Sequence, residues 1–216
     1  KKNIVVTGSH GKTTTTSLIA KILSEAKLDP TIVNGGVVNS LGGSAKLGKG
    51  DWAVLEADES DGSFLNLPVN YSVVTNVDEE HLDFYKNFKN LKKSFENFVN
   101  KTPTFGKSFL CTDNQELKKI AFKLKSRNFL TYGFNKKANY QILNTIYKKN
   151  HSVFDLRIST PLLKTKTIRK IKVNLIGSHN ILNSVAAIAL CSYIGVNLKT
   201  IKKSLREFAG IQRRMT

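Results

Sequence analysis

The feature that most constrains the fold is a short glycine-rich turn between an expected strand and an expected helix. Asn3–Thr7 is a run of apolar and β-branched residues, which is typical of a buried strand. It leads directly into Gly8–Thr14, with the sequence GSHGKTT, and a helical apolar pattern follows over Leu18–Ala26. A buried strand, a glycine-rich turn and a helix in this order favour an α/β fold built on a parallel sheet.

The same turn has the composition of a phosphate-binding loop. Glycines let backbone N–H groups approach phosphates, and the N-terminus of the following helix adds positive potential. Lys12 would reach the terminal phosphates and Thr13 would bind Mg²⁺. The spacing is shorter than G-x-x-x-x-G-K-[ST], because Val6 stands where the first glycine would be. We expect the nucleotide to contact Gly8, Ser9, His10, Gly11, Lys12, Thr13 and Thr14.

The alternative for Lys12 is a surface lysine that follows an ordinary glycine turn. A lysine at the start of a helix lies at the unfavourable end of the helix dipole, and a bound anion would remove that conflict. The phosphate-loop interpretation is therefore the stronger of the two.

Strands and helices alternate along most of the remaining chain. We expect strands at Thr31–Val33 (followed by a glycine-rich loop), Trp52–Glu56, Tyr71–Thr75 and Ser108–Cys111, and helices over Phe88–Val99, Glu116–Leu124, His179–Tyr193 and Lys199–Phe208. Between about 128 and 176 the pattern changes to alternation, with a hairpin of Tyr140–Tyr147 and Ser152–Ile158. The predicted fold class is α/β, with a P-loop-type, mostly parallel sheet flanked by helices and a small antiparallel β-sheet at about 128–176.

Acidic residues gather in one part of the chain. Nine of the 16 lie within residues 51–83. Glu56 ends a predicted buried strand, which is where a nucleotide-binding sheet holds a metal carboxylate. Asp58, Glu59 and Asp61 follow, and these acids either cap a helix or bind a cation.

His81 follows the next predicted strand and also lies among acids. It is either a structural or solvated histidine or a metal ligand, and imidazole is an unusual ligand for Mg²⁺.

Basic residues dominate the second half. Residues 117–216 carry 21 basic and 2 acidic side chains, within a net charge of +18 for the chain. This segment is either a surface for polyanions such as nucleic acid or a solvated lysine-rich surface. Lysine outnumbers arginine 28 to 6, which favours the solvated surface, because specific nucleic-acid recognition depends on arginine and stacked aromatics. We expect no nucleic-acid partner.

Composition excludes several other classes. Hydrophobic residues at 40% and charged residues at 23% are ordinary for a globular protein and exclude disorder. The apolar stretch Ile181–Ile194 is too short and too polar to span a membrane, and no signal-peptide pattern opens the chain. Cys111 and Cys191 lie in apolar segments and are interpreted as reduced core thiols of a cytoplasmic protein.

Four sequence blocks and a short closing motif together resemble the Mur ligase family. They are TGSHGKTTTTSLIA at Thr7–Ala20, EADESDGSFLNL at Glu56–Leu67, VVTNVDEEHLDFY at Val73–Tyr85, GSHNILNSVAAIA at Gly177–Ala189 and GIQRR at Gly210–Arg214. They span nearly the whole chain, and EADESDGSF is most similar to the branch that adds L-alanine to UDP-N-acetylmuramate.

The resemblance implies a role for individual residues. Lys12 would contact the β- and γ-phosphates, and Thr13, Glu56 and His81 would hold Mg²⁺, which makes Lys12, Glu56 and His81 the expected catalytic residues. His179, Asn180 and Asn183 would flank the adenine, and Arg214 would reach the phosphates. For Asn180 and Asn183 the alternative is helix N-terminal capping.

The resemblance also implies an activity and a domain organisation. ATP would phosphorylate the carboxylate of UDP-N-acetylmuramate, and the amine of L-alanine would attack the acyl phosphate in the bacterial cytoplasm. Residues 1–216 would be the central ATP-binding domain, with a UDP-sugar-binding domain before it and a further domain after it, both absent from this chain and both needed for ligation. The alternatives are another P-loop NTPase or small-molecule kinase, and a basic nucleic-acid-binding domain.

Overall fold

The computed structural model describes residues 1–38, 43–124, 128–161 and 163–210. The strands are β1 (Lys2–Thr7), β2 (Thr31–Val38), β3 (Gly43–Lys46), β4 (Trp52–Glu56), β5 (Tyr71–Val74), β6 (Lys107–Cys111), β7 (Phe129–Gly133), β8 (Tyr140–Tyr147), β9 (Ser152–Thr160) and β10 (Leu163–Val173). The helices are α1 (Lys12–Glu25), α2 (Leu82–Tyr85), α3 (Phe88–Asn100), α4 (Gln115–Lys123), α5 (Ser178–Tyr193) and α6 (Leu198–Arg206), with a 3₁₀ turn, η2, at Ser63–Asn66.

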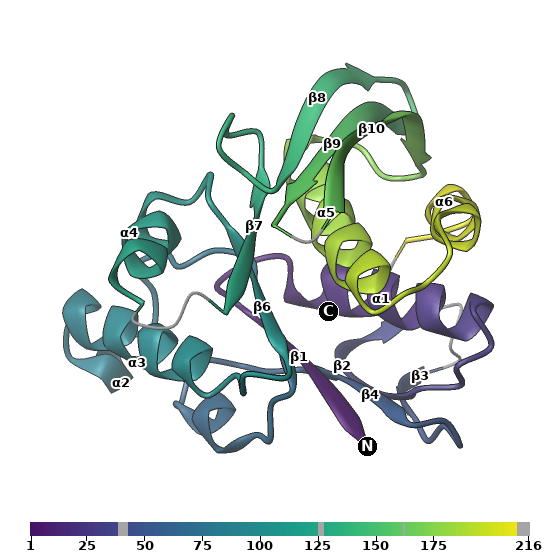
Figure 1. Cartoon of the computed structure of the whole chain (residues 1–216). Helices are drawn as coiled ribbons and strands as arrows, with labels where there is room; N and C mark the ends of the chain where they lie inside the picture. The colour runs from purple at the N-terminus through teal and green to yellow at the C-terminus, as the bar shows by residue number, and fades with distance from the viewer. Residues whose placement is uncertain (39–42, 125–127, 162, 211–216) are drawn as a thin grey trace.

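All these strands form one sheet with the order β10-β9-β8-β7-β6-β5-β1-β4-β2-β3. From β2 through β4, β1, β5, β6 and β7 to β8, each neighbouring pair is parallel. Figure 1 shows α1, α5 and α6 on one side of the central strands and α2, α3 and α4 on the other. The predicted α/β class, with a mostly parallel sheet flanked by helices, is confirmed.

The antiparallel part of the fold is present but does not form a separate sheet. β8, β9 and β10 pair antiparallel with one another, and β8 joins β7 through the pairs Tyr132↔Tyr140 and Gly133↔Gln141. Phe129–Gly133, at the edge of the predicted antiparallel region, pairs parallel with β6 instead. The antiparallel strands therefore extend the main sheet at one end.

At the other end of the sheet, the strand predicted from the sequence is shorter than the strand in the structure. A strand at Thr31–Val33 followed by a glycine-rich loop was expected, whereas β2 continues to Val38 and returns as β3. The two strands pair antiparallel, with Ile32 opposite Lys46 and Val33 opposite Ala45. Glycine is depleted in strands, so the sequence alone favoured a loop here. Backbone pairing with β3 nevertheless makes the segment a strand.

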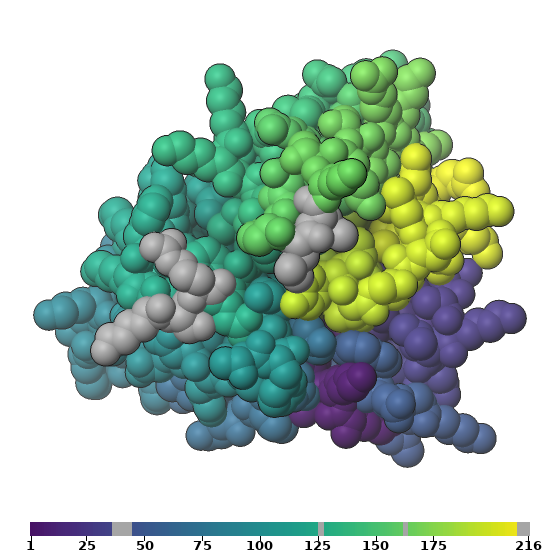
Figure 2. Space-filling model, viewed as in Figure 1, coloured from purple at the N-terminus to yellow at the C-terminus, as the bar shows by residue number. Residues whose placement is uncertain are grey.

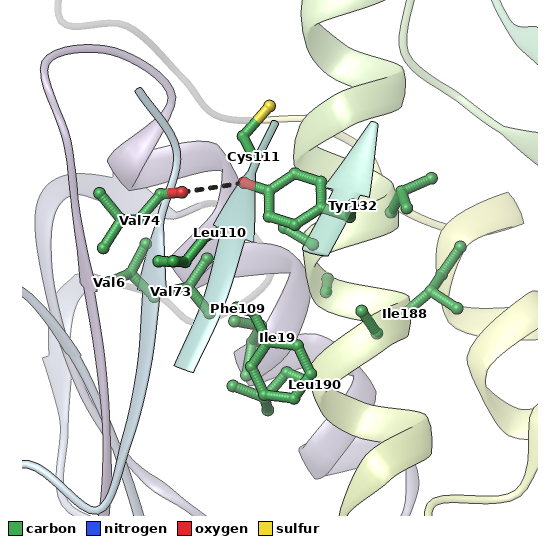
Figure 3. Close-up of a cluster of buried hydrophobic side chains, with 14 of the residues drawn as sticks. Val6, Ile19, Val73, Val74, Phe109, Leu110, Cys111, Tyr132, Ile188 and Leu190 are labelled. Atoms are coloured by element: carbon green, nitrogen blue, oxygen red, sulfur yellow. Dashed lines mark hydrogen bonds between the residues drawn. The ribbon is translucent and has the colours of Figure 1, made fainter. Parts of the chain in front are cut away.

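The core includes buried residues of α3 and α4 as well as of α1 and α5, and one part of it lies between the central strands and the α1/α5 layer. Figure 3 shows Val6, Val73 and Phe109 from the sheet gathered with Ile19 of α1 and Leu190 of α5, and each of these side chains is fully buried. The hydroxyl of buried Tyr132 reaches the carbonyl of Val74 at 3.4 Å. The helices that cover this face are thus fixed by apolar contacts from several strands.

Both cysteines are buried and free, as the sequence predicted. Burial raises the pKa of the Cys111 thiol to about 11 and the pKa of the Cys191 thiol further. Both therefore remain protonated thiols at neutral pH. Among the helices that the structure describes, none is long and apolar enough to cross a membrane.

Segments from the two ends of the sequence lie side by side. α1 packs against α5 and α6, and Figure 2 shows the C-terminal segment in yellow directly against the N-terminal segment in purple. This packing brings the N-terminal half of α5 to the glycine-rich loop that precedes α1.

Candidate functional site

The glycine-rich loop is held against the end of β5. Thr75 Oγ1 donates a hydrogen bond to the carbonyl of His10 at 2.6 Å, and the backbone N–H of His10 donates to Asn76 Oδ1 at 2.8 Å. Gly8 has φ +131°, and a Cβ there would lie 2.2 Å from Thr75 Oγ1. This position needs glycine both for its backbone angle and for the close approach of the β5 loop.

Gly11 closes the loop at the N-terminus of α1. It has φ +83°, and a Cβ there would lie 2.4 Å from Asn183 Oδ1. Asn183 is buried, at 8% exposure, in the first half of α5. The structure therefore places Asn183 next to the glycine-rich loop.

Lys12, the first residue of α1, folds back across the loop. Its Nζ donates to the carbonyl of Gly8 at 2.8 Å and to the carbonyl of Ser9 at 3.4 Å, and it pairs with Glu59 Oε2 at 2.8 Å. The ammonium thus lies inside the loop that would surround a phosphate, which is where a phosphate-contacting lysine is needed.

Thr13 and Glu56 are in direct contact. The Thr13 hydroxyl donates to Glu56 Oε1 at 2.9 Å, and the backbone N–H of Gly35 donates to Glu56 Oε2 at 2.7 Å. A hydroxyl beside a carboxylate at the carboxyl end of β4 offers the hard oxygen ligands that Mg²⁺ prefers. Thr14, next along the chain, is half-buried in the first turn of α1.

His81 faces Glu59 and Asp58, two acids of the segment after β4. Its Nε2 lies 3.7 Å from Glu59 Oε1, and ligand atoms of Asp58, Glu59 and His81 all fall within 4.8 Å of one another. His81 has φ +56°, an angle that is uncommon for a residue other than glycine. Asp58, Glu59 and His81 therefore form a set of possible cation ligands in addition to the Thr13–Glu56 pair.

Tyr85 anchors the loop that carries Glu59. The Tyr85 hydroxyl donates a hydrogen bond to the backbone carbonyl of Glu59. Burial, together with the negative charge of Glu59, raises the pKa of Tyr85 to about 12. The hydroxyl therefore remains a donor throughout the neutral pH range.

His10 stands on the outer side of the loop and is exposed. Its Nε2 lies 3.4 Å from a carboxylate oxygen of Glu80 and 3.6 Å from one of Asp78. The backbone N–H of Asp78 donates to Ser9 Oγ at 2.9 Å, so the acidic segment after β5 contacts the loop at two successive residues.

Of the remaining predicted site residues, Asn180 and His179 lie at the start of α5. Asn180 donates to the carbonyl of Ile176 at 2.8 Å, which ties the start of α5 to the preceding turn. His179 is exposed in the same turn. Arg214 lies outside the described residues.

Sequence reasoning passed over Glu59, which the structure brings to the centre of the site. It is 1% exposed and contacts both Lys12 and His81. From sequence it was one of three loop acids without a distinguishing pattern. Its pairing with Lys12 joins residues 47 positions apart, and local sequence does not encode such a contact.

The fold and this loop together define a class of protein: an α/β domain with a glycine-rich loop between a strand and a helix, at the carboxyl edge of its parallel strands. The Mur ligase middle domain matches residues 6–191 of the chain. The chain belongs to the Mur ligase family.

Similar proteins agree with this assignment. UDP-N-acetylmuramate–L-alanine ligase of Pelagibacter ubique is 58% identical over 213 residues, which cover 99% of this chain and 46% of that protein. The protein of the same name from Rhodospirillum centenum is 42% identical over 217 residues, covering all of this chain and 45% of that protein. The chain thus spans a little under half the length of these curated relatives.

Two solved structures share the fold. The UDP-N-acetylmuramate-alanine ligase of Thermotoga maritima superposes with a TM-score of 0.85 at 29% identity, over 99% of this chain and 46% of that one. A UDP-N-acetylmuramate:L-alanyl-gamma-D-glutamyl-meso-diaminopimelate ligase of Neisseria superposes with a TM-score of 0.84 at 26% identity, over 98% of this chain and 67% of that one.

Proposed function

We propose that this chain is the ATP-binding part of a ligase that joins L-alanine to UDP-N-acetylmuramate in bacterial peptidoglycan synthesis. The observation that carries the proposal is Lys12, held by carbonyls of the glycine-rich loop beside the carboxyl ends of β1 and β4. The relative from Pelagibacter ubique, 58% identical, supports the choice of substrates. We propose a cytoplasmic location, in keeping with these soluble small-molecule substrates.

In this proposal the chain's residues position and neutralise charge. Lys12 contacts the phosphates of ATP, Thr13 would bind one Mg²⁺, and Glu56 and His81 would hold metal near the γ-phosphate. The ion, when bound, supplies charge stabilisation for the transferring phosphoryl group. The lactyl carboxylate of UDP-N-acetylmuramate becomes an acyl phosphate, the alanine amine attacks its carbonyl carbon, and phosphate leaves. No protein nucleophile is required, and catalysis consists of orientation and electrostatic stabilisation.

For the base, we propose that Asn180, Asn183 and His179 of α5 lie on the adenine side and that Arg214 reaches the phosphates. The contact between Gly11 and Asn183 supports this, because it brings α5 next to the loop. We further propose that residues 1–216 form the central domain, and that segments corresponding to the remaining length of the relatives bind the UDP-sugar and close over the acyl phosphate.

Replacing Lys12 tests the nucleotide site. Lys12→Ala should abolish detectable ATP binding or weaken it by about 2–4 kcal/mol, because the phosphates lose a charge-assisted hydrogen bond in a half-buried site. Calorimetry in Mg²⁺ buffer measures the affinity. Lys93→Ala on α3, whose side chain is 61% exposed, removes the same charge elsewhere and should leave binding unchanged. Equal ATP affinity for Lys12→Ala and the unaltered chain would reject the phosphate-loop assignment.

Product formation tests the domain proposal. The 216 residues alone should bind Mg-ATP but form no UDP-N-acetylmuramoyl-L-alanine, since holding three substrates in reactive geometry contributes about 7–11 kcal/mol of barrier lowering. The measurement is chromatography of a mixture of ATP, UDP-N-acetylmuramate, L-alanine and the purified chain. Robust turnover would show that no further domain is needed.

A further inference from the structure

Glu59 is a buried carboxylate held in a fixed position next to the phosphate loop. It is 1% exposed, and its backbone carbonyl accepts from the Tyr85 hydroxyl and from the N–H of Gly62 at 3.2 Å. Moving the Glu59 backbone towards solvent would break both hydrogen bonds, to Tyr85 and to Gly62. A buried carboxylate is costly unless a cation balances it.

In this structure Lys12 is that cation. An ammonium has three hydrogens to donate, and Lys12 has three acceptors: the carbonyls of Gly8 and Ser9 and the carboxylate of Glu59. A phosphate that binds Lys12 must therefore displace one of them. The carboxylate is the one that repels an incoming phosphate, so it is the acceptor that a phosphate would displace.

The second oxygen of Glu59 is buried and has unused hydrogen-bond acceptor capacity. Within the described part of the chain, Glu59 Oε1 has no hydrogen-bond donor, and it faces His81 Nε2 at 3.7 Å. A ligand atom of Asp58 lies in the same cluster, within 4.8 Å of the others. The two carboxylates repel each other at this separation, whereas a divalent cation could bind both of them and the imidazole.

We propose that Glu59 exchanges cations when nucleotide binds: it releases Lys12 to the phosphates and takes the divalent cation as its new partner, together with His81. This inference rests on the proposed function and assigns Glu59 a role within the same site. It makes nucleotide binding and cation binding depend on each other, since phosphate on Lys12 without a cation at Glu59 leaves a buried carboxylate unpaired.

The exchange predicts that Glu59→Gln has opposite effects on metal-free ATP binding and on the enhancement of binding by Mg²⁺. Glu59→Gln should strengthen binding of metal-free ATP, because the carboxylate no longer competes with phosphate for Lys12. The same substitution should weaken the enhancement that Mg²⁺ gives by about tenfold or more, a coupling of ordinary size for two linked sites.

The experiment is calorimetry on the 216-residue chain with the non-hydrolysable analogue AMP-PNP, once in Mg²⁺ and once in EDTA. Glu79→Gln is the matched control, because Glu79 is an exposed acid two positions from His81 and loses the same charge. It should leave both affinities unchanged. If Glu59→Gln weakens binding equally in Mg²⁺ and in EDTA, Glu59 is structural and the exchange is wrong.

A second measurement does not depend on nucleotide or on the folding of Glu59→Gln. In Lys12→Met the carboxylate has lost its partner, so the nucleotide-free chain should bind Mn²⁺ about tenfold more tightly than the unaltered chain, as measured by electron paramagnetic resonance. Unchanged Mn²⁺ affinity would overturn the exchange. If the unaltered chain binds no nucleotide at all, the proposed function fails, and this Mn²⁺ comparison still decides the role of Glu59.

Discussion

The two ends of the sheet differ in what they carry. The parallel strands β1, β4 and β5 end in the phosphate loop, Glu56 and the segment that leads to His81. Of the antiparallel strands β8 to β10, β9 and β10 carry exposed basic residues, and none of the three carries a predicted site residue. Parallel strands bring all their carboxyl ends to one edge, so polar side chains from distant segments meet there. Antiparallel strands point their ends both ways, and here they contribute packing against α5 and α6.

The largest effect we expect concerns whether these two regions unfold together. Phe154 of β9 is fully buried, and Phe154→Ala should lower the free energy of unfolding by about 3–5 kcal/mol. Trp52, the one tryptophan, lies on β4 in the parallel region. If one sheet gives one cooperative unit, the urea midpoint measured by Trp52 fluorescence should fall with the substitution in β9.

Phe122→Ala on α4 is the control for this experiment. It removes the same phenyl ring from a position that is 72% exposed. Its midpoint should stay close to that of the unaltered chain. A Trp52 transition unaffected by Phe154→Ala would mean that β8 to β10 unfold as a separate unit. The parallel and antiparallel regions of the sheet would then be two independent folding units.

A smaller effect on stability is expected in the parallel region, with a larger effect on binding. Gly8→Ala places a Cβ 2.2 Å from Thr75 Oγ1 at a φ of +131°. It should cost about 1–3 kcal/mol of stability and displace the loop, with a large loss of ATP affinity in calorimetry.

Gly195→Ala separates backbone strain from collision. Gly195 also has a positive φ, +92°, but nothing lies within 4 Å of a Cβ there. This variant should lose some stability and keep its ATP affinity. If both variants bind ATP normally, the close contact between the loop and β5 is not needed for the site.

The same comparison shows which features the sequence could reveal. The strands Trp52–Glu56 and Tyr140–Tyr147 have the bounds that were predicted, because a continuous apolar run and a clear alternation are local signals. The β2–β3 hairpin was missed, because its strands are held by backbone pairing with a register shift between Val33 and Val38, and the glycines of this segment carry no side-chain pattern. That β8 continues the main sheet depends on two residue pairs with β7, which are tertiary contacts.

The candidate site was predictable to a similar extent. Lys12, Thr13 and Glu56 were identified because each follows or ends a recognisable strand, and the structure brings Thr13 and Glu56 into contact. Glu59 was not singled out, since its importance arises from burial and from pairing with Lys12 across the fold. The ligand roles of all the predicted site residues, Lys12 and Thr13 included, stay predictions.

The weakest effect we expect belongs to the basic region. Lys170 and Lys172 of β10 face Lys199, Lys202, Lys203 and Arg206 across a groove of about 520 Å³, and none of the described residues that line it is aromatic. Lysines on a solvated surface bind polyanions through counterion release alone, so heparin or duplex DNA should bind weakly at low salt and lose affinity steeply as salt rises. Fluorescence anisotropy of labelled DNA across a salt series measures this, and Lys170→Gln with Lys202→Gln should reduce the salt slope. Sub-micromolar DNA binding at physiological salt would instead favour a nucleic-acid-binding role for this end of the sheet.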